Sequence, residues 1–102
     1  ITGIGVVSSI GIGNDKFWKN LIAGKSGISE VETFDTSKYE NHRGGEVKDF
    51  NPLDFIDRNR LKGLGRGSQF AIAATKLALE DAKIKLNKIH YKVRVATRVD
   101  VP

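Results

Sequence analysis

The sequence predicts an α/β fold, in which short strands and helices alternate along the chain. Two observations lead to this prediction. The first is an opening stretch of β-branched apolar residues and glycines that leads into a helical pattern. The second is an alanine-rich segment, residues 69–82, whose apolar residues recur with helical spacing. The predicted order is strand, helix, short strands, two helices and a final strand.

The first seven residues are mostly apolar and β-branched, which predicts a buried strand, and residues 8–13 predict a loop. Gly3 and Gly5 add no side chain to this strand, which suits close approach of another backbone. A strand and glycine turn before a helix can also bind a phosphate. The dinucleotide fingerprint G-x-G-x-x-G, however, ends here in Ser8. We therefore favour a packing role for the two glycines.

A first helix is predicted from Asn14, a preferred N-cap residue, to Gly24, which can end a helix in the left-handed conformation. Its four large apolar residues fall on one face, namely Phe17, Trp18, Leu21 and Ile22. Short strands are predicted around residues 28–31 and 44–47. Asn51 and Pro52 then supply an N-cap and an N1 proline for a second, brief helix.

The three glycines that follow are too many for a helix interior: Gly63, Gly65 and Gly67. Ser68 is placed to cap the strongest helix, from about Gln69 to Ala82. This helix is apolar around most of its circumference, and about 100 residues can hardly bury it on all sides. Its alanines allow close approach to a neighbour. We therefore expect the chain to be a piece of something larger.

The chain has 102 residues and no cysteine, which excludes disulfides, thiolate zinc sites and a cysteine nucleophile within it. Its two histidines, His42 and His90, have no obvious acidic partner and are interpreted as surface residues. No complete catalytic constellation is present. No apolar run reaches membrane-spanning length, so we expect no membrane partner. The lack of cysteine does not settle the compartment but fits a cytoplasmic protein, which we expect. We also expect no cofactor and no metal.

Charge is unevenly distributed between the two halves. Residues 1–57 carry 6 basic and 9 acidic residues, whereas residues 58–102 carry 11 basic and 3 acidic residues. No acid occurs from Arg58 to Leu79. This asymmetry indicates either an acidic partner for the second half or a solvated basic face. The sequence leaves both interpretations open.

Several stretches together resemble the N-terminal part of a β-ketoacyl-acyl-carrier-protein synthase, most closely the elongating type II enzymes of fatty acid synthesis. They run in family order over residues 1–82: Thr2–Ser8 with Gly11, Phe17–Ile28, Phe34–Thr36, Gly45–Pro52, Ser68–Ala74 and Ala78–Ala82. The resemblance implies part of a thiolase-like fold, in which two similar α/β halves stack as five layers. It also implies a homodimer that condenses an acyl-enzyme thioester with malonyl-carrier protein and releases carbon dioxide.

The family's catalytic cysteine and two histidines would lie beyond this chain, so we expect the chain alone to be inactive. The opening at Ile1 also indicates that the first residues of the first strand are missing. Departures from the family pattern gather in residues 83–102. Lys83 stands where a glycine usually ends the long helix, and Arg94 and Arg98 interrupt a strand, predicted over residues 93–99, that is usually apolar. We therefore divide the chain into family-like residues 1–82 and divergent residues 83–102.

The resemblance implies that basic residues just before the long helix receive the acidic carrier protein. Arg58 and Lys62 match basic positions of that segment, and Arg60 and Arg66 are further candidates for docking. Two alternatives remain, a non-catalytic association domain of the same fold and a basic nucleic-acid-binding module. A nucleic-acid-binding module would place aromatic residues among the basic ones, and Phe70 is the only aromatic residue from Arg58 to Lys76. We therefore disfavour this alternative and expect no nucleic acid partner.

Overall fold

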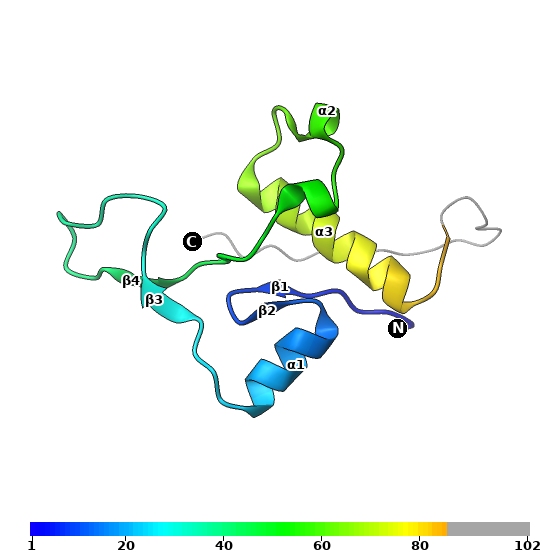
Figure 1. Cartoon of the computed structure of the whole chain (residues 1–102), viewed down its shortest axis with the longest axis horizontal. Helices are drawn as coiled ribbons and strands as arrows, with labels where there is room; N and C mark the ends of the chain where they lie inside the picture. The colour runs from blue at the N-terminus through cyan, green and yellow to red at the C-terminus, as the bar shows by residue number, and fades with distance from the viewer. Residues whose placement is uncertain (86–102) are drawn as a thin grey trace.

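The computed structural model describes residues 1–85 of the chain. Helices and strands are both present, as the predicted α/β class requires (Figure 1). In chain order the elements are β1 (Val7–Ser8), β2 (Gly11–Ile12), α1 (Asn14–Ile22), β3 (Ile28–Glu30), β4 (Arg43–Gly45), the 3-10 helix η1 (Pro52–Asp54), α2 (Arg58–Leu61) and α3 (Arg66–Asp81). The strands form two antiparallel pairs, β1 with β2 and β3 with β4. The strand predicted over residues 93–99 lies outside the described residues.

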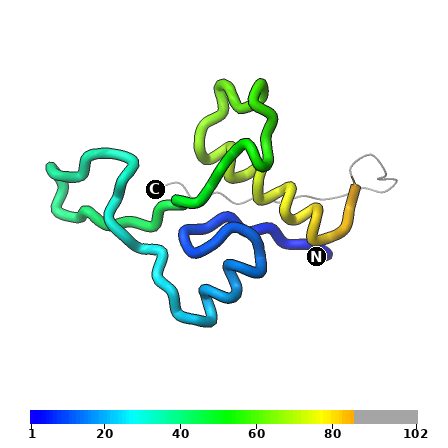
Figure 2. Tube along the Cα trace, in the orientation of Figure 1, coloured from blue at the N-terminus to red at the C-terminus, as the bar shows by residue number. Residues whose placement is uncertain are grey.

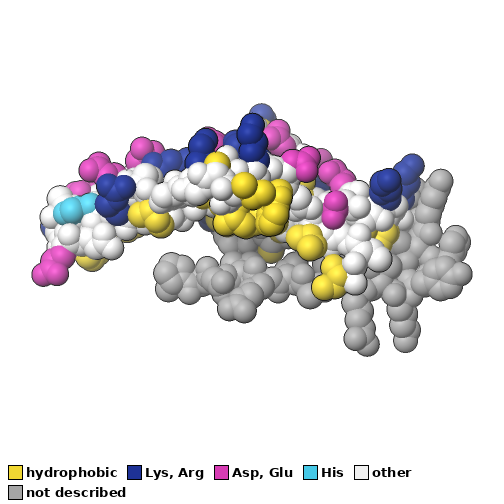
Figure 3. Space-filling model, turned by 90° about the horizontal axis from the view of Figure 1, so that it is seen from below, with side chains coloured by type: hydrophobic (Ala, Val, Ile, Leu, Met, Phe, Trp, Pro, Cys, Tyr) yellow, Lys and Arg dark blue, Asp and Glu magenta, His cyan; other side chains and the backbone are white. Residues whose placement is uncertain are grey.

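The chain is open rather than compact, and its core is small. Its radius of gyration is 15.7 Å, whereas about 13 Å is typical of a compact domain of 100 residues. Among the described residues, the buried apolar side chains are Phe50, Ile56 and Ala73. The predicted apolar face of α1 is largely exposed, with Trp18 at 60% of its full accessibility. In Figure 3 charged side chains gather along the upper edge of the molecule and apolar ones lie below them.

The N-terminal segment runs along the C-terminal half of α3 (Figure 2). A Cβ placed on Gly5 would lie 2.5 Å from the backbone nitrogen of Ala78, and one placed on Gly3 would lie 2.6 Å from the Cβ of Ala82. Both distances are shorter than any contact that a Cβ atom makes with a non-bonded atom, so a larger residue at either position would clash. The predicted close approach of glycines to another backbone is therefore confirmed, and the partner is the alanine-rich face of α3. This contact is the packing role that the sequence favoured for the two glycines.

The prediction of a strand over residues 1–7 is wrong for most of that segment. Of residues 1–8 only Val7 and Ser8 are in a strand, although the carbonyl of Val6 also accepts the N–H of Gly13 at 2.8 Å, and residues 1–5 make no backbone–backbone hydrogen bond within residues 1–85. Side chains bind this backbone instead. The N–H of Ile4 donates to Asp81 Oδ2 at 2.9 Å, and the carbonyl of Ile4 accepts from Asn14 Nδ2 at 2.6 Å. Ile4 itself is exposed, because no second layer covers it in this part of the chain.

The segment predicted as a loop is a tight hairpin, in which Val7 pairs with Ile12 and Ser8 with Gly11. The Ser8 hydroxyl donates to the Gly11 carbonyl at 2.8 Å, which closes the turn. The side-chain amide of Asn20, on α1, donates to the carbonyl of Ile10 in the same turn. Asn20 is the one buried polar side chain of the described chain, and it ties the hairpin to α1.

Helix α1 begins one residue earlier than predicted. Gly13, with φ of 88°, is the N-cap, and Asn14 is the first helical residue. The prediction that Asn14 caps the helix is wrong because its side chain is bound to Ile4 instead. The end of the helix is as predicted, since Gly24 has φ of 70°, in the left-handed region.

Of the two N-caps predicted further along the chain, one is confirmed and the other is wrong. Asn51 caps η1, because its side chain accepts the N–H of Leu53 at 3.1 Å, as predicted. Ser68 does not cap α3, which begins at Arg66 after Gly65. The N–H of Gln69 bonds to the carbonyl of Gly65 at 3.1 Å, so the helical ladder already includes the residues around Ser68. Within residues 1–85, no helix is long and apolar enough to cross a bilayer.

Lys83 ends α3 in the left-handed conformation, with φ of 57°. This conformation costs a residue with a side chain about 1–2 kcal/mol, and glycine avoids that cost. We expect Lys83→Gly to raise the free energy of unfolding by about 1 kcal/mol, measured by urea denaturation. The matched variant Glu80→Gly, inside α3, should lower it by a similar amount. A loss of stability in Lys83→Gly would contradict the assignment of strain to Lys83.

Candidate functional site

Three of the four predicted basic residues occupy the loop between η1 and α3, which carries α2 at its tip (Figure 1). Arg58 and Arg60 lie on α2, and Lys62 is the residue that ends it. All three side chains are exposed. α2 is a single turn, with Arg58 as its first residue and Lys62 as its C-cap. The structure therefore brings three of the four candidates together on one short, exposed element.

Arg66, the fourth candidate, is bound to the protein rather than directed to solvent alone. Its guanidinium carbon lies 5.0 Å from the ring centre of Phe50 and 4.9 Å from that of Phe70. Its Nη2 also donates to the carbonyl of Val47 at 3.2 Å. Arginine stacks on aromatic rings and donates in the plane of its guanidinium at the same time. Sequence reasoning grouped Arg66 with the other three cations and missed these partners.

An aromatic cluster, Phe50, Phe55 and Phe70, holds the loop against α3. Phe50 and Phe55 stack with their ring centres 5.8 Å apart, and Phe50 meets Phe70 edge-to-face at 5.0 Å. Lys76 on α3 donates to the carbonyl of Phe55, and Gln69 Nε2 donates to the carbonyl of Leu64 at 3.1 Å. These contacts fix both halves of the loop relative to the long helix. The loop that carries Arg58, Arg60 and Lys62 is therefore held in place at both of its ends.

The charge on this loop suits a transient acidic partner. Two carboxylates, Asp54 and Asp57, accompany the basic residues, but the ion pairs of the described chain lie elsewhere, at Lys16–Asp49 and Lys48–Glu32. Exposed cations without fixed ion pairs accelerate encounter with a negative surface, and salt weakens the effect. The arrangement supports binding and carries no chemistry of its own.

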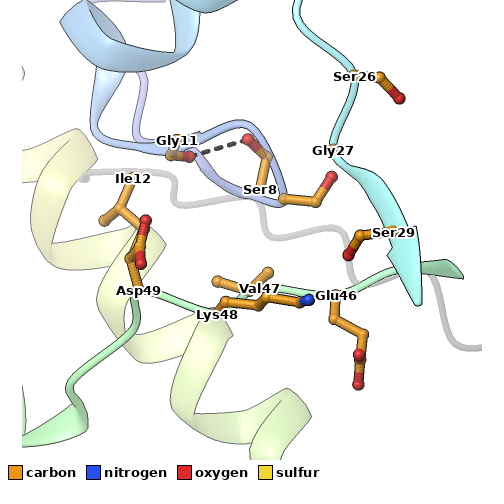
Figure 4. Close-up of a pocket in the computed structure, with 11 residues that line it drawn as sticks. Ser8, Gly11, Ile12, Ser26, Gly27, Ser29, Glu46, Val47, Lys48 and Asp49 are labelled. Carbon is orange, nitrogen blue, oxygen red and sulfur yellow. Dashed lines mark hydrogen bonds between the residues drawn. The ribbon is translucent and has the colours of Figure 1, made fainter. Parts of the chain in front are cut away.

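A polar hollow of about 230 Å³ lies between the β1–β2 turn, the segment leading into β3, and residues 46–49 (Figure 4). It is lined by Ser8, Ser9, Gly11, Ile12, Ser26, Gly27, Ser29 and Glu46–Asp49. No histidine or cysteine is among these residues, and none of the hydrogen bonds found in residues 1–85 joins one of its serines to Glu46, Lys48 or Asp49. In residues 1–85, no group of three metal-ligating side chains occurs. His42 bonds to Thr36 Oγ1 at 3.1 Å on the surface, as its interpretation required, and His90 lies outside the described residues.

Glu46, beside the hollow, fastens β4 to the strand opposite. The Thr33 hydroxyl and the backbone N–H groups of Glu32 and Thr33 all donate to its carboxylate, the N–H of Glu32 at 2.7 Å. These donors, with that hydroxyl first, hold the pKa of Glu46 below its ordinary value, and the charge of Lys48 adds a smaller effect. Glu46 is therefore ionised in the folded protein at neutral pH.

This lowered pKa predicts a loss of local stability in acid. Because the folded pKa lies below the ordinary value of 4.5, the stabilisation is complete above that pH and is lost as the pH falls through the folded pKa. We expect the amides of Glu32 and Thr33 to exchange with deuterium faster in acid, after correction for intrinsic rates. In Glu46→Gln this additional pH dependence should be absent. Equal pH dependence in both proteins would contradict the assignment to Glu46.

The comparisons with known proteins agree with this architecture. Residues 1–99 match the family described as the N-terminal domain of β-ketoacyl synthases. The chain therefore belongs to the β-ketoacyl synthase family, as the resemblance in the sequence predicted. It is 37% identical over 90 residues to 3-oxoacyl-[acyl-carrier-protein] synthase 2 of Synechocystis sp., and 38% identical over 88 residues to the protein of that name in Staphylococcus aureus.

These matches cover most of this chain and a small part of its relatives. They span 88% and 86% of the chain but only 22% of each relative's length. A solved structure described as the ishigamide ketosynthase/chain length factor superposes with a TM-score of 0.80 and 37% identity, over 87% of this chain and 22% of that one. The predicted partial thiolase-like fold is thereby confirmed. The exposed apolar surface is consistent with a chain that spans about a fifth of such proteins.

Proposed function

We propose that this chain is the N-terminal part of a β-ketoacyl-acyl-carrier-protein synthase. Such an enzyme condenses an acyl-enzyme thioester with malonyl-carrier protein, with decarboxylation, and so extends the acyl chain by two carbons. The observation that carries the proposal is the family match over residues 1–99, together with 37–38% identity to two proteins named 3-oxoacyl-[acyl-carrier-protein] synthase 2. Residues 1–82 would be the family-like part and residues 83–102 the divergent part.

The chain would contribute scaffold and docking surface, and the nucleophile would come from elsewhere in the protein. Condensation needs a thiolate, and this chain has no cysteine. The loop bearing Arg58, Arg60 and Lys62 would receive the acidic acyl carrier protein, with Arg66 at its base. Three exposed cations on one anchored element support this role. We further propose that the complete protein is a cytoplasmic homodimer, as the family resemblance implies.

The proposal is tested first on the complete reading frame that includes this chain. We expect its product to contain a cysteine in a small-residue context followed by two spaced histidines. That product should form 3-oxoacyl-carrier protein from an acyl thioester and malonyl-carrier protein, and alkylation with iodoacetamide should abolish the activity. A product of the same fold that lacks the cysteine and the activity would instead be a non-catalytic association domain, and the proposal would be wrong.

The docking surface is tested in a chimeric synthase. In this chimera, residues 1–82 of the present chain replace the matched segment of the Staphylococcus aureus relative. Its catalytic residues come from that relative, so the test does not depend on what adjoins this chain. The Michaelis constant (KM) is measured for a carrier-linked substrate and for a small thioester that has no carrier.

A further inference from the structure

Arg66 differs from the other three basic residues in how it is held. Its guanidinium lies against two aromatic rings that also contact each other edge-to-face, 5.0 Å from the centre of Phe50 and 4.9 Å from that of Phe70, and it donates to the carbonyl of Val47 at 3.2 Å. Phe50 is 93% buried, so part of this contact is shielded from water. Arg66 as a residue is exposed to solvent, but these three contacts hold its guanidinium against the protein.

The partners of Arg66 lie on both sides of the loop that carries α2. Val47 and Phe50 precede residues 51–65, whereas Arg66 and Phe70 follow them. Arg66 therefore closes the base of this loop by joining its two ends. Closing a loop restricts the positions that its tip can reach. The tip is α2, with the exposed side chains of Arg58, Arg60 and Lys62.

We propose that Arg66 is a positioning residue, which orients α2 for the carrier protein by clamping Phe50, Phe70 and the Val47 carbonyl. The inference rests on the proposed function, and it replaces the expectation that Arg66 contacts the partner with its own charge. Only a planar guanidinium can stack on rings and donate to a carbonyl in its plane together. An ammonium group supplies the same charge without that geometry, so lysine is the decisive substitution.

The test compares Arg66→Lys and Arg66→Gln in the chimeric synthase. We expect both to raise KM for the carrier-linked substrate by about threefold to tenfold, because both lose the aromatic clamp. Neither should change KM for the small thioester. The salt dependence of the carrier KM should stay as in the unsubstituted chimera, since the three cations on α2 remain. The control is Arg43→Lys. Arg43 is also an exposed arginine, and it donates to the carbonyl of Ile28 within the β3–β4 pair, away from α2. This variant should change neither KM value nor the salt dependence.

Hydrogen–deuterium exchange over residues 51–65 reports the anchor independently of activity. We expect faster exchange there in Arg66→Lys and unchanged exchange in Arg43→Lys. If Arg66→Lys behaves as the parent in exchange and in KM, while Arg66→Gln weakens the salt dependence, Arg66 contacts the partner directly and the inference is wrong. If the loop loosens but neither Arg66→Lys nor the reversal of Arg58 and Lys62 alters the carrier KM, the anchor stands and the proposed docking function fails.

Discussion

Replacing Gly5 with valine should destabilise the fold by at least about 3 kcal/mol, at the upper end of the cost of overpacking. A Cβ at this position would lie 2.5 Å from the backbone nitrogen of Ala78 and 2.9 Å from the Cβ of Leu77. The nearest atoms include α3 backbone, which cannot move aside as a flexible side chain can. The N-terminal segment would have to leave α3, and the bond from Ile4 to Asp81 would be lost with it.

The measurement is urea denaturation of the chimeric synthase, followed by circular dichroism. The matched control is Gly65→Ala, because a Cβ on Gly65 meets no atom within 4 Å and its φ of −70° is open to any residue. This control should change the free energy of unfolding by no more than about 0.5 kcal/mol. If Gly5→Val were as mild as Gly65→Ala, the segment would not pack on α3 in the way described.

Reversing Arg58 and Lys62 together to glutamate should raise the carrier-linked KM of the chimera roughly tenfold. Each exposed ionic contact contributes about 0.2–1 kcal/mol, and reversal adds repulsion to each lost attraction. A total of about 1.4 kcal/mol corresponds to a factor of ten. The small-thioester KM should remain nearly unchanged, because the tip of α2 carries no part of the chemistry.

Salt distinguishes docking from a structural effect in this double variant. The Debye length falls from about 10 Å at 0.1 M to about 3 Å at 1 M ionic strength, so the difference between variant and parent should shrink as salt is added. A charge-neutral pair, Arg58→Gln with Lys62→Gln, should give a smaller increase in KM. If both substrates are affected equally at every salt concentration, the basic cluster is a solvated or structural face and not a docking surface.

Local patterns predicted those features that depend on neighbouring residues. The spacing of apolar residues predicted α1 and α3, and Asn51 before Pro52 predicted the cap of η1, which the structure confirms. Gly24 ends α1 as its conformational freedom indicated. The small residues Gly3 and Gly5 predicted a close contact. For the helices and their ends, the physical cause lies within a few positions along the chain, whereas the glycines predicted only that a contact would be close and not that α3 would be the partner.

Tertiary structure decided the remaining features, because the partner is distant along the chain. Asn14 does not cap α1, since its amide binds the carbonyl of Ile4 in a segment that packs on α3. The opening segment makes no backbone–backbone hydrogen bond through residue 5 within residues 1–85, because sheet pairing needs a neighbouring strand and the described residues provide none there. Arg66 looks like any other cation in sequence, and only folding brings Phe50 and Val47 to its guanidinium. The sequence by itself determined the family, the helices α1 and α3 and the basic composition of the α2 loop, whereas the fold determined that Arg66 contacts the aromatic base of that loop and that Arg58, Arg60 and Lys62 are exposed.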